Sequence, residues 1–154
     1  MNAISIKQPF ALLIAIGLKT IETRSWKTDY RGKLLICAAQ DAHTGFYLSG
    51  DKKRPCEYFV SKIRKATNQH LAFGHAIAIS NLVDVRPMKK EDERKALIPF
   101  FPDAYAWVLE NTQIIKTPFP ITGQMGIFNA EIPNNINLGC HQCGASELSF
   151  CHHQ

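Results

Sequence analysis

The chain has 154 residues, with 45% hydrophobic and 20% charged side chains, and its formal net charge is +5. This composition is that of one globular domain with its own core, and it excludes a wholly disordered chain. The longest apolar run, residues 10–16, is far shorter than the roughly 20 residues that span a bilayer, and no signal-peptide cleavage pattern follows it. We therefore expect a cytoplasmic protein without a membrane partner, and its basic balance permits an anionic partner such as nucleic acid.

The N-terminal half is predicted to start with a strand and a buried helix. Residues 3–7 alternate apolar and polar side chains, as a short strand does. Pro9 suits the first turn of a helix, the following seven residues are apolar nearly all round, and Gly17 suits the position after the helix end. Further along, the pattern predicts strands at residues 19–24 and 33–39, loops at residues 26–32 and 41–55, and a helix at residues 57–71.

The C-terminal half is predicted to consist mainly of strands. Residues 75–86 alternate most clearly, with Ile77, Ile79, Val83 and Val85 expected on one face. A short charged helix is expected at residues 89–97, and three more strands are expected at residues 105–109, 114–117 and 127–132. Many short strands with few helices indicate an α+β domain built around a small β-barrel with flanking helices. The predicted domains are residues 1–133 and a short Cys/His-rich tail at residues 134–154.

The segment Lys19 to Arg24 holds the most informative charges. In an extended strand Glu22 and Arg24 project from the same face, and Lys19, at the start of the strand, is expected to be free to swing toward them. A carboxylate beside two cations is a polar pocket that can bind a ligand or move a proton. The alternative is a solvated strand face with weak ion pairs.

Five further residues near this segment are candidates for ligand binding. Lys7 and Gln8 come just before a helix start, where a ligand phosphate or carbonyl can meet free backbone N–H groups. Trp26, Tyr30 and Arg31 lie in a polar loop, and aromatic side chains interleaved with cations suit base stacking and phosphate pairing. For Lys7 and Gln8 the alternative is a plain strand end without a ligand. For the loop, the alternative is that Trp26 closes the barrel and Arg31 pairs with an acidic side chain.

Several stretches of the sequence resemble the ASCH domain, a branch of the PUA-like superfamily. They are Ile4-Ser5-Ile6-Lys7-Gln8-Pro9-Phe10-Ala11, Gly17-Leu18-Lys19-Thr20-Ile21-Glu22-Thr23-Arg24, Tyr30-Arg31-Gly32-Lys33-Leu34-Leu35-Ile36, Tyr105-Ala106-Trp107-Val108-Leu109 and Pro118-Phe119-Pro120 before Gly123-Gln124. The resemblance implies a barrel of five or six strands with a cleft over its mouth that binds RNA or modified nucleosides.

The same resemblance implies an alternative activity. Some small ASCH proteins are amidohydrolases that remove the acetyl group of N4-acetylcytidine, and their motif lysine matches Lys19. The threonine of their motif is replaced here by Glu22, so a covalent threonine mechanism does not carry over. The remaining hypothesis makes Glu22 the base that activates water, with Lys19 or Arg24 stabilising an oxyanion.

The tail carries a third hypothesis. Cys140, Cys143, Cys151 and His153 are a candidate tetrahedral set for a structural zinc ion, since a short tail without a core needs a staple to become ordered. The alternative is a frayed tail with incidental cysteines. No cofactor is expected for the barrel. Three functions thus remain open: binding of RNA, single-stranded nucleic acid or a modified nucleoside; hydrolysis of an acetylated nucleoside; and protein interaction through a zinc-bearing tail.

Overall fold

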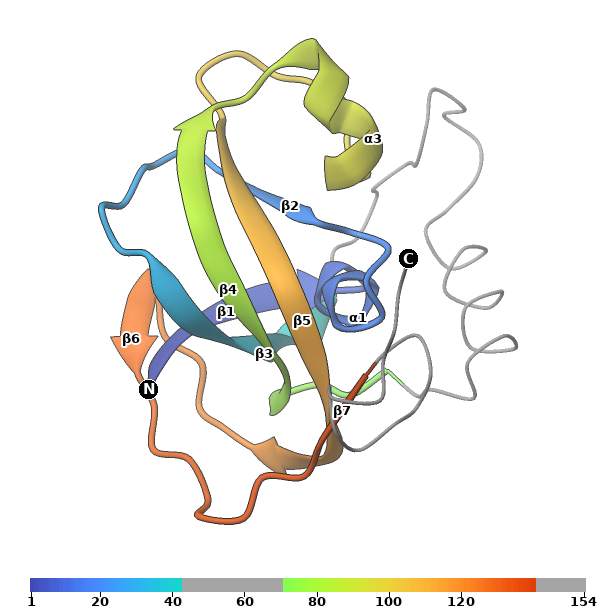
Figure 1. The fold of residues 1–154 in the computed structure, drawn as a ribbon, viewed down its shortest axis with the longest axis vertical. Helices are drawn as coiled ribbons and strands as arrows, with labels where there is room; N and C mark the ends of the chain where they lie inside the picture. Colours follow the sequence, from blue (N-terminus) through green and yellow to red (C-terminus); the bar gives the residue numbers. More distant parts are fainter. Residues whose placement is uncertain (43–70, 141–154) are drawn as a thin grey trace.

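The fold is mostly β-sheet, as a computed structural model of residues 1–42 and 71–140 shows (Figure 1). The strands are β1 (Asn2–Gln8), β2 (Ile21–Arg24), β3 (Gly32–Ala42), β4 (His75–Pro87), β5 (Tyr105–Pro120), β6 (Ile127–Asn129) and β7 (Leu138–Cys140). The helical elements are α1 (Phe10–Ala15), the 3₁₀ turn η1 (Lys90–Asp92) and α3 (Glu93–Ala96). The helix predicted at residues 57–71 lies almost wholly outside the described residues.

All described strands belong to one sheet, which is open. The strand order is β2-β5-β4-β3-β1-β6, with β7 added to β5. β1 pairs with β3 in parallel, and the other pairings are antiparallel. The prediction of a closed barrel was therefore wrong. In a closed barrel the two end strands of the sheet pair with each other. Here the end strands are β2 and β6: β2 is four residues long and pairs with β5, and β6 pairs with β1 over residues 2–4.

The long strands β4 and β5 lie side by side along the molecule (Figure 1). The sequence predicted two strands at residues 105–109 and 114–117, whereas the structure has one strand of 16 residues. Asn111 adopts a φ of 51° between these two segments, and the pairing with β4 shifts there from Asn81↔Glu110 to Ile79↔Gln113. An extra residue on one strand is a β-bulge, which bends the strand without ending it.

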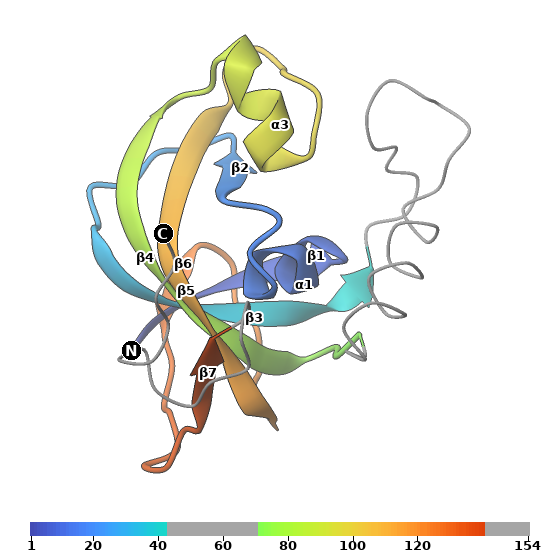
Figure 2. The ribbon, with the colours of Figure 1, turned by 45° about the vertical axis from the view of Figure 1, so that its right-hand side comes forward.

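The main core lies on the concave side of the curved sheet. Figure 2 shows β4 and β5 curving together, with α1 on the inner side and α3 near one end. All six residues of α1 are buried, as the apolar pattern predicts. Register shifts break the alternation expected for β4, because Ile77 packs with α1 whereas Ile79 packs in a second cluster with Cys37 and Phe128.

The end of the described chain contributes to the same sheet. β7 pairs with β5 through Gln113↔Cys140, Ile114↔Gly139 and Ile115↔Leu138. The division at residue 133 stays a prediction, but residues 138–140 already add to the sheet of the first domain. Within the described residues, no helix is long and apolar enough to cross a membrane.

Candidate nucleic-acid interface

Lys19 is buried immediately after α1. Gly17, with a φ of 77°, turns the chain, and the N–H groups of Leu18 and Lys19 both donate to Leu13 O at 3.0 Å. The Lys19 Nζ donates to Ala96 O at 2.5 Å and lies 3.4 Å from Glu22 Oε2. The expectation of a freely swinging Lys19 was wrong, because its side chain is 1% exposed and tied to the end of α3.

Burial changes the proton affinity of this lysine. Removal from water lowers the pKa of the Lys19 ammonium, and Arg24 adds a smaller lowering, while the charge and hydrogen bond of Glu22 act in the opposite direction. The Phe10 ring, with its centroid 5.1 Å from Nζ, adds a cation–π contact that offsets part of the lost hydration. Perturbed titration beside a cavity is typical of functional sites, although structural ion pairs also cause it.

Glu22 and Arg24 project together, as the two-residue spacing predicts. The Arg24 Nε lies 3.3 Å from Glu22 Oε1, so Glu22 has a cation on each side. The Arg24 Nη2 also donates to Ser5 O at 2.9 Å. Because Ser5 belongs to β1 and Arg24 to β2, this side chain bridges the two strands where the sheet stays open.

A cavity of about 520 Å³ lies at this opening, and we call it the seam cavity. Its walls come from β1, β2 and the segments 98–101 and 124–126. The charged members of the lining are Lys7, Lys19, Glu22 and Arg24. This volume falls in the range of about 300–1,000 Å³ that small-molecule sites occupy. The structure therefore places four of the predicted site residues around one hollow.

Trp26 also lines the seam cavity, against a buried partner. Its ring meets that of Trp107 edge to face, with centroids 4.6 Å apart, and the Trp107 Nε1 donates to Trp26 O at 3.3 Å. Trp107 is completely buried, so the pair holds one wall of the cavity rigidly. Trp26 thus has a packing role as well as a surface toward the hollow.

Gln8, Tyr30 and Arg31 are not among the residues that line the cavity. Gln8 is buried, where its Oε1 accepts from Leu12 N and its Nε2 donates to Ala72 O. Tyr30 OH donates to Lys33 O. Arg31 Nη1 donates to Thr28 O and Tyr30 O, and Nη2 lies 3.8 Å from Asp84 Oδ1. Ligand roles for these three stay predictions, with no support from their position.

The apolar part of the seam cavity was not predicted from the sequence, and its two exposed side chains are those of Phe101 and Met125. Phe101 is 41% exposed and Met125 is 98% exposed, and both line the hollow. The signal was present, because the pair Phe100-Phe101 lies between two prolines and Met125 lies between Gly123 and Gly126. Large apolar side chains that stay exposed together at one hollow are typical of a binding surface.

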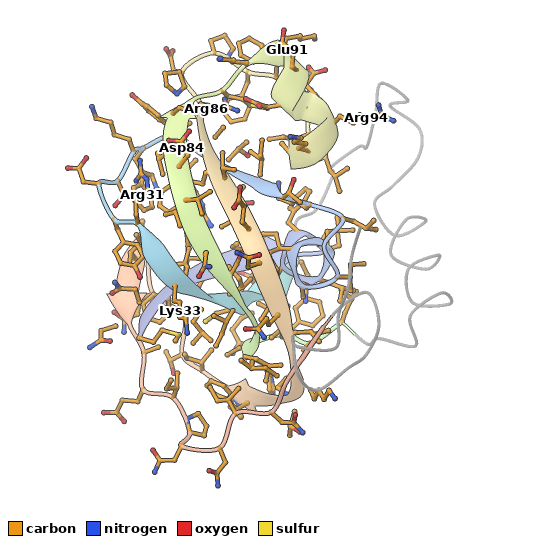
Figure 3. The ribbon with its side chains drawn as sticks, in the orientation of Figure 1. Arg31, Lys33, Asp84, Arg86, Glu91 and Arg94 are labelled. Carbon is orange, nitrogen blue, oxygen red and sulfur yellow. The ribbon has the colours of Figure 1, made fainter. Side chains whose placement is uncertain are left out.

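A second hollow, of about 540 Å³, lies by β5 and α3 and includes Arg86 and Lys95. Its arginine is already engaged, because Arg86 holds both carboxylate oxygens of Asp92 at 2.7 and 2.8 Å. Figure 3 shows Arg31, Asp84 and Arg86 close together beside β4, at the start of this ion-pair chain. Its chemistry is that of a structural network, so the seam cavity is the better candidate site.

The predicted zinc ligands lie almost wholly outside the part of the chain that the structure describes. Cys143, Cys151 and His153 lie outside the described residues, and the described part of the chain holds no group of three or more His, Cys, Asp or Glu side chains placed for a metal ion. The Cys140–His153 set and the interaction role of the tail therefore stay predictions.

The described residues thus form an open, curved sheet with a cavity that charged and apolar side chains line beside β1 and β2. Residues 4–119 match the ASCH domain family, and the chain belongs to this family. The predicted resemblance is therefore confirmed.

This chain is similar to two curated relatives and to several solved structures. Activating signal cointegrator 1 of Mus musculus is 28% identical over 145 residues, and that of Homo sapiens is 27% identical over 139 residues. Each match covers 83% of this chain, which spans about a fifth, 22%, of either relative. The crystal structure of ASCH from Zymomonas mobilis aligns with a TM-score of 0.53 over 84% of this chain and 87% of that one. At 15% identity, this likeness shows the fold alone.

Proposed function

We propose that the seam cavity binds RNA, with one unpaired base or a modified nucleoside inside it. The observation that carries this proposal is the pairing of a charged floor with apolar walls. The floor is the Lys19–Glu22–Arg24 ion network, and the walls include the exposed side chains of Phe101 and Met125. A nucleobase has the matching surface, because its edge forms hydrogen bonds and its two faces stack on apolar groups.

The charge around the cavity supports a polyanion as the ligand. The chain carries a formal net charge of +5, and the exposed Lys7 lines the cavity. A lysine beside a base site can pair with a backbone phosphate, which adds affinity without sequence preference. The ASCH family membership points in the same direction, since the resemblance implies RNA or modified-nucleoside binding.

Single-stranded RNA fits this cavity better than a duplex. A base can enter a hollow only after it leaves its stack, and bases in loops or single strands are already free to do so. Exposed Phe101 and Met125 then replace the stacking partners that the base gives up. We therefore expect stronger binding to an unstructured oligonucleotide than to a hairpin stem of the same length.

The test is a fluorescence anisotropy titration of a labelled single-stranded RNA against the wild type and a Phe101→Ala/Met125→Ala double variant. Stacking is worth about 1–3 kcal/mol per base, so the double variant should bind at least about fivefold more weakly. Phe73→Ala is the matched control, since Phe73 is 38% exposed and does not line the cavity. Equal binding by all three proteins contradicts the proposal, as does a wild type that does not bind.

Hydrolysis of an acylated nucleoside is a second candidate, favoured by one specific contact. Lys19 Nζ and Glu22 Oε2 lie 3.4 Å apart in the floor of the cavity, and burial lowers the pKa of this lysine. In this mechanism Glu22 accepts a proton from water while the water oxygen attacks the acyl carbon. Arg24 or Lys19 stabilises the oxyanion. The C–N bond then breaks, the proton passes to the leaving nitrogen, and acetate is released.

Acetate release from N4-acetylcytidine, free and within RNA, tests this candidate. Loss of a required base typically lowers turnover a hundredfold or more, so Glu22→Gln should lose turnover while it still binds the nucleoside. No release by the wild type, or full activity of Glu22→Gln, rejects the hydrolase and leaves the binding function as the conclusion.

A further inference from the structure

Two buried side-chain atoms have no hydrogen-bond partner within the described residues, Ser5 Oγ and Arg24 Nε. A buried polar group left unpaired costs free energy, so such groups are few and each calls for an explanation. Arg24 Nε is 3.3 Å from Glu22 Oε1, close enough for charge attraction but without a hydrogen bond. Ser5 Oγ has neither kind of partner among the described residues.

The two atoms belong to residues that already touch each other. Arg24 Nη2 donates to the backbone carbonyl of Ser5 at 2.9 Å, which fixes the guanidinium against β1. Both residues line the seam cavity, together with Glu22. The residues that line the cavity therefore include two with an unused donor, the Ser5 hydroxyl and the Arg24 Nε–H, and one carboxylate that can accept, that of Glu22.

We infer that Ser5, Arg24 and Glu22 form a subsite for a planar H–N–C=O group, the lactam edge of a keto nucleobase. This inference rests on the proposed function and names the class of base. Ser5 Oγ and Arg24 Nε donate to the carbonyl oxygen, which has two lone pairs, and Glu22 accepts from the adjacent ring N–H. Hydrogen bonds to charged groups are stronger than those between neutral groups, so Arg24 and Glu22 orient the base, and Ser5 adds one neutral hydrogen bond to its carbonyl oxygen.

This arrangement of two donors and one acceptor distinguishes uracil and guanine from cytosine and adenine. Uracil and guanine carry a ring N–H beside a carbonyl, which meets both requirements. Cytosine presents a bare ring nitrogen next to its carbonyl, so a lone pair would face the Glu22 carboxylate. Adenine has no carbonyl to accept from Ser5 and Arg24. A site built to hydrogen-bond a group discriminates strongly against a ligand that lacks it, because the buried polar atoms then stay unpaired.

Gly123 lies close to the Ser5 hydroxyl and offers an independent way to disturb the subsite. A Cβ added at Gly123 would lie 2.4 Å from Ser5 Oγ and 3.4 Å from Ser5 Cβ. The hydroxyl must then rotate away, since 2.4 Å is too short for any real contact of a methyl group. Gly123→Ala should thus misplace the Ser5 donor while the serine itself is retained.

The experiment compares oligo(U) with oligo(C) of equal length on the wild type, Ser5→Ala and Gly123→Ala. Both ligands are pyrimidines of one size and charge, so their difference reports the base edge. One lost neutral hydrogen bond corresponds to about fivefold in affinity. We expect both variants to bind oligo(U) about fivefold more weakly and oligo(C) within about twofold of the wild type, which itself prefers oligo(U).

Thermal unfolding of the free variants separates a binding role of Ser5 from a structural one. Because the hydroxyl has no hydrogen-bond partner within residues 1–42 and 71–140, Ser5→Ala should leave the melting temperature unchanged or raise it. A lowered melting temperature together with equal loss for both ligands overturns the inference. Unchanged oligo(U) affinity in Ser5→Ala, or a wild type that binds both oligonucleotides equally, overturns it as well while RNA binding stands. A wild type that binds neither overturns the proposed function and this inference together.

Discussion

Arg24 Nη2 donates a hydrogen bond of 2.9 Å to Ser5 O and joins β2 to β1 across the open part of the sheet. A backbone pairing at this place would close the barrel and fill the space between the strands. The long arginine side chain holds the two edges together at a greater separation, and the seam cavity lies in the space that remains. The bridge therefore links the stability of the fold to the shape of the site.

Arg24→Lys tests this bridge because it keeps the charge but removes the fork of donors. A hydrogen bond from a charged group contributes about 1.5–3 kcal/mol, so we expect the free energy of unfolding in urea to fall by roughly 1–2 kcal/mol for this partly exposed bond. The control is Arg31→Lys, since the hydrogen bonds of Arg31 run to nearby loop carbonyls, its ion pair with Asp84 is long at 3.8 Å, and its side chain is 39% exposed. A larger loss in the control than in Arg24→Lys would show that the bridge does not hold the sheet.

Lys19 should make stability depend on alkaline pH. Burial lowers the pKa of Lys19 in the folded protein, so between that value and the ordinary value of 10.5 the unfolded chain binds more protons. The contribution of Lys19 to stability then rises with pH through this window. The difference in unfolding free energy between the wild type and Lys19→Met should grow in favour of the wild type from neutral pH toward pH 10.5. A difference that stays constant with pH contradicts the burial argument.

The local parts of the fold and site could be predicted from the sequence. A helix that is apolar on all sides must be buried, and residues two apart on a strand share a face, so α1 and the Glu22–Arg24 pair follow from the pattern. The bend in β5 could not be predicted in this way, because the left-handed Asn111 signals a turn as readily as a bulge. Whether a strand ends or bends there depends on its pairing with β4, which is a long-range contact.

The burial of Lys19 and the open sheet also depend on long-range contacts. Lysine at the start of a strand is usually solvated. Its burial here depends on Glu22 nearby and on a long-range contact, the hydrogen bond to the carbonyl of Ala96, 77 residues away in the chain. The opening exists because β2 is short and Arg24 spans the gap to Ser5. Phe101 and Met125 reach the cavity from distant loops, which no periodicity in the sequence places together.

Asp92 should make stability depend on acidic pH. Two hydrogen bonds from Arg86, one from Lys89 N and the nearby positive charges lower the pKa of Asp92. Its contribution is present at neutral pH and is lost as the pH falls through this lowered pKa. Asp92→Asn should thus cost about 2 kcal/mol at pH 7 and progressively less in acid, as urea unfolding measures. Asp84→Asn, at a carboxylate that is 51% exposed, should show little change at either pH, and an equal effect of the two variants would refute the role of the Arg86–Asp92 pair.

Lys7 should account for one phosphate contact in RNA binding. It is exposed and lines the seam cavity, so a backbone phosphate next to the bound base lies within reach of its ammonium group. For single strands each such contact adds about 0.7 to the slope of log affinity against log salt. Lys7→Ala should lower this slope by about 0.7 and weaken binding alike for oligo(U) and oligo(C), because phosphates carry no base identity. Lys33→Ala is the matched control, since Lys33 is exposed near the start of β3, apart from the cavity (Figure 3). If both lysine variants reduce the slope equally, the basic surface attracts RNA in general and Lys7 has no particular contact at the site.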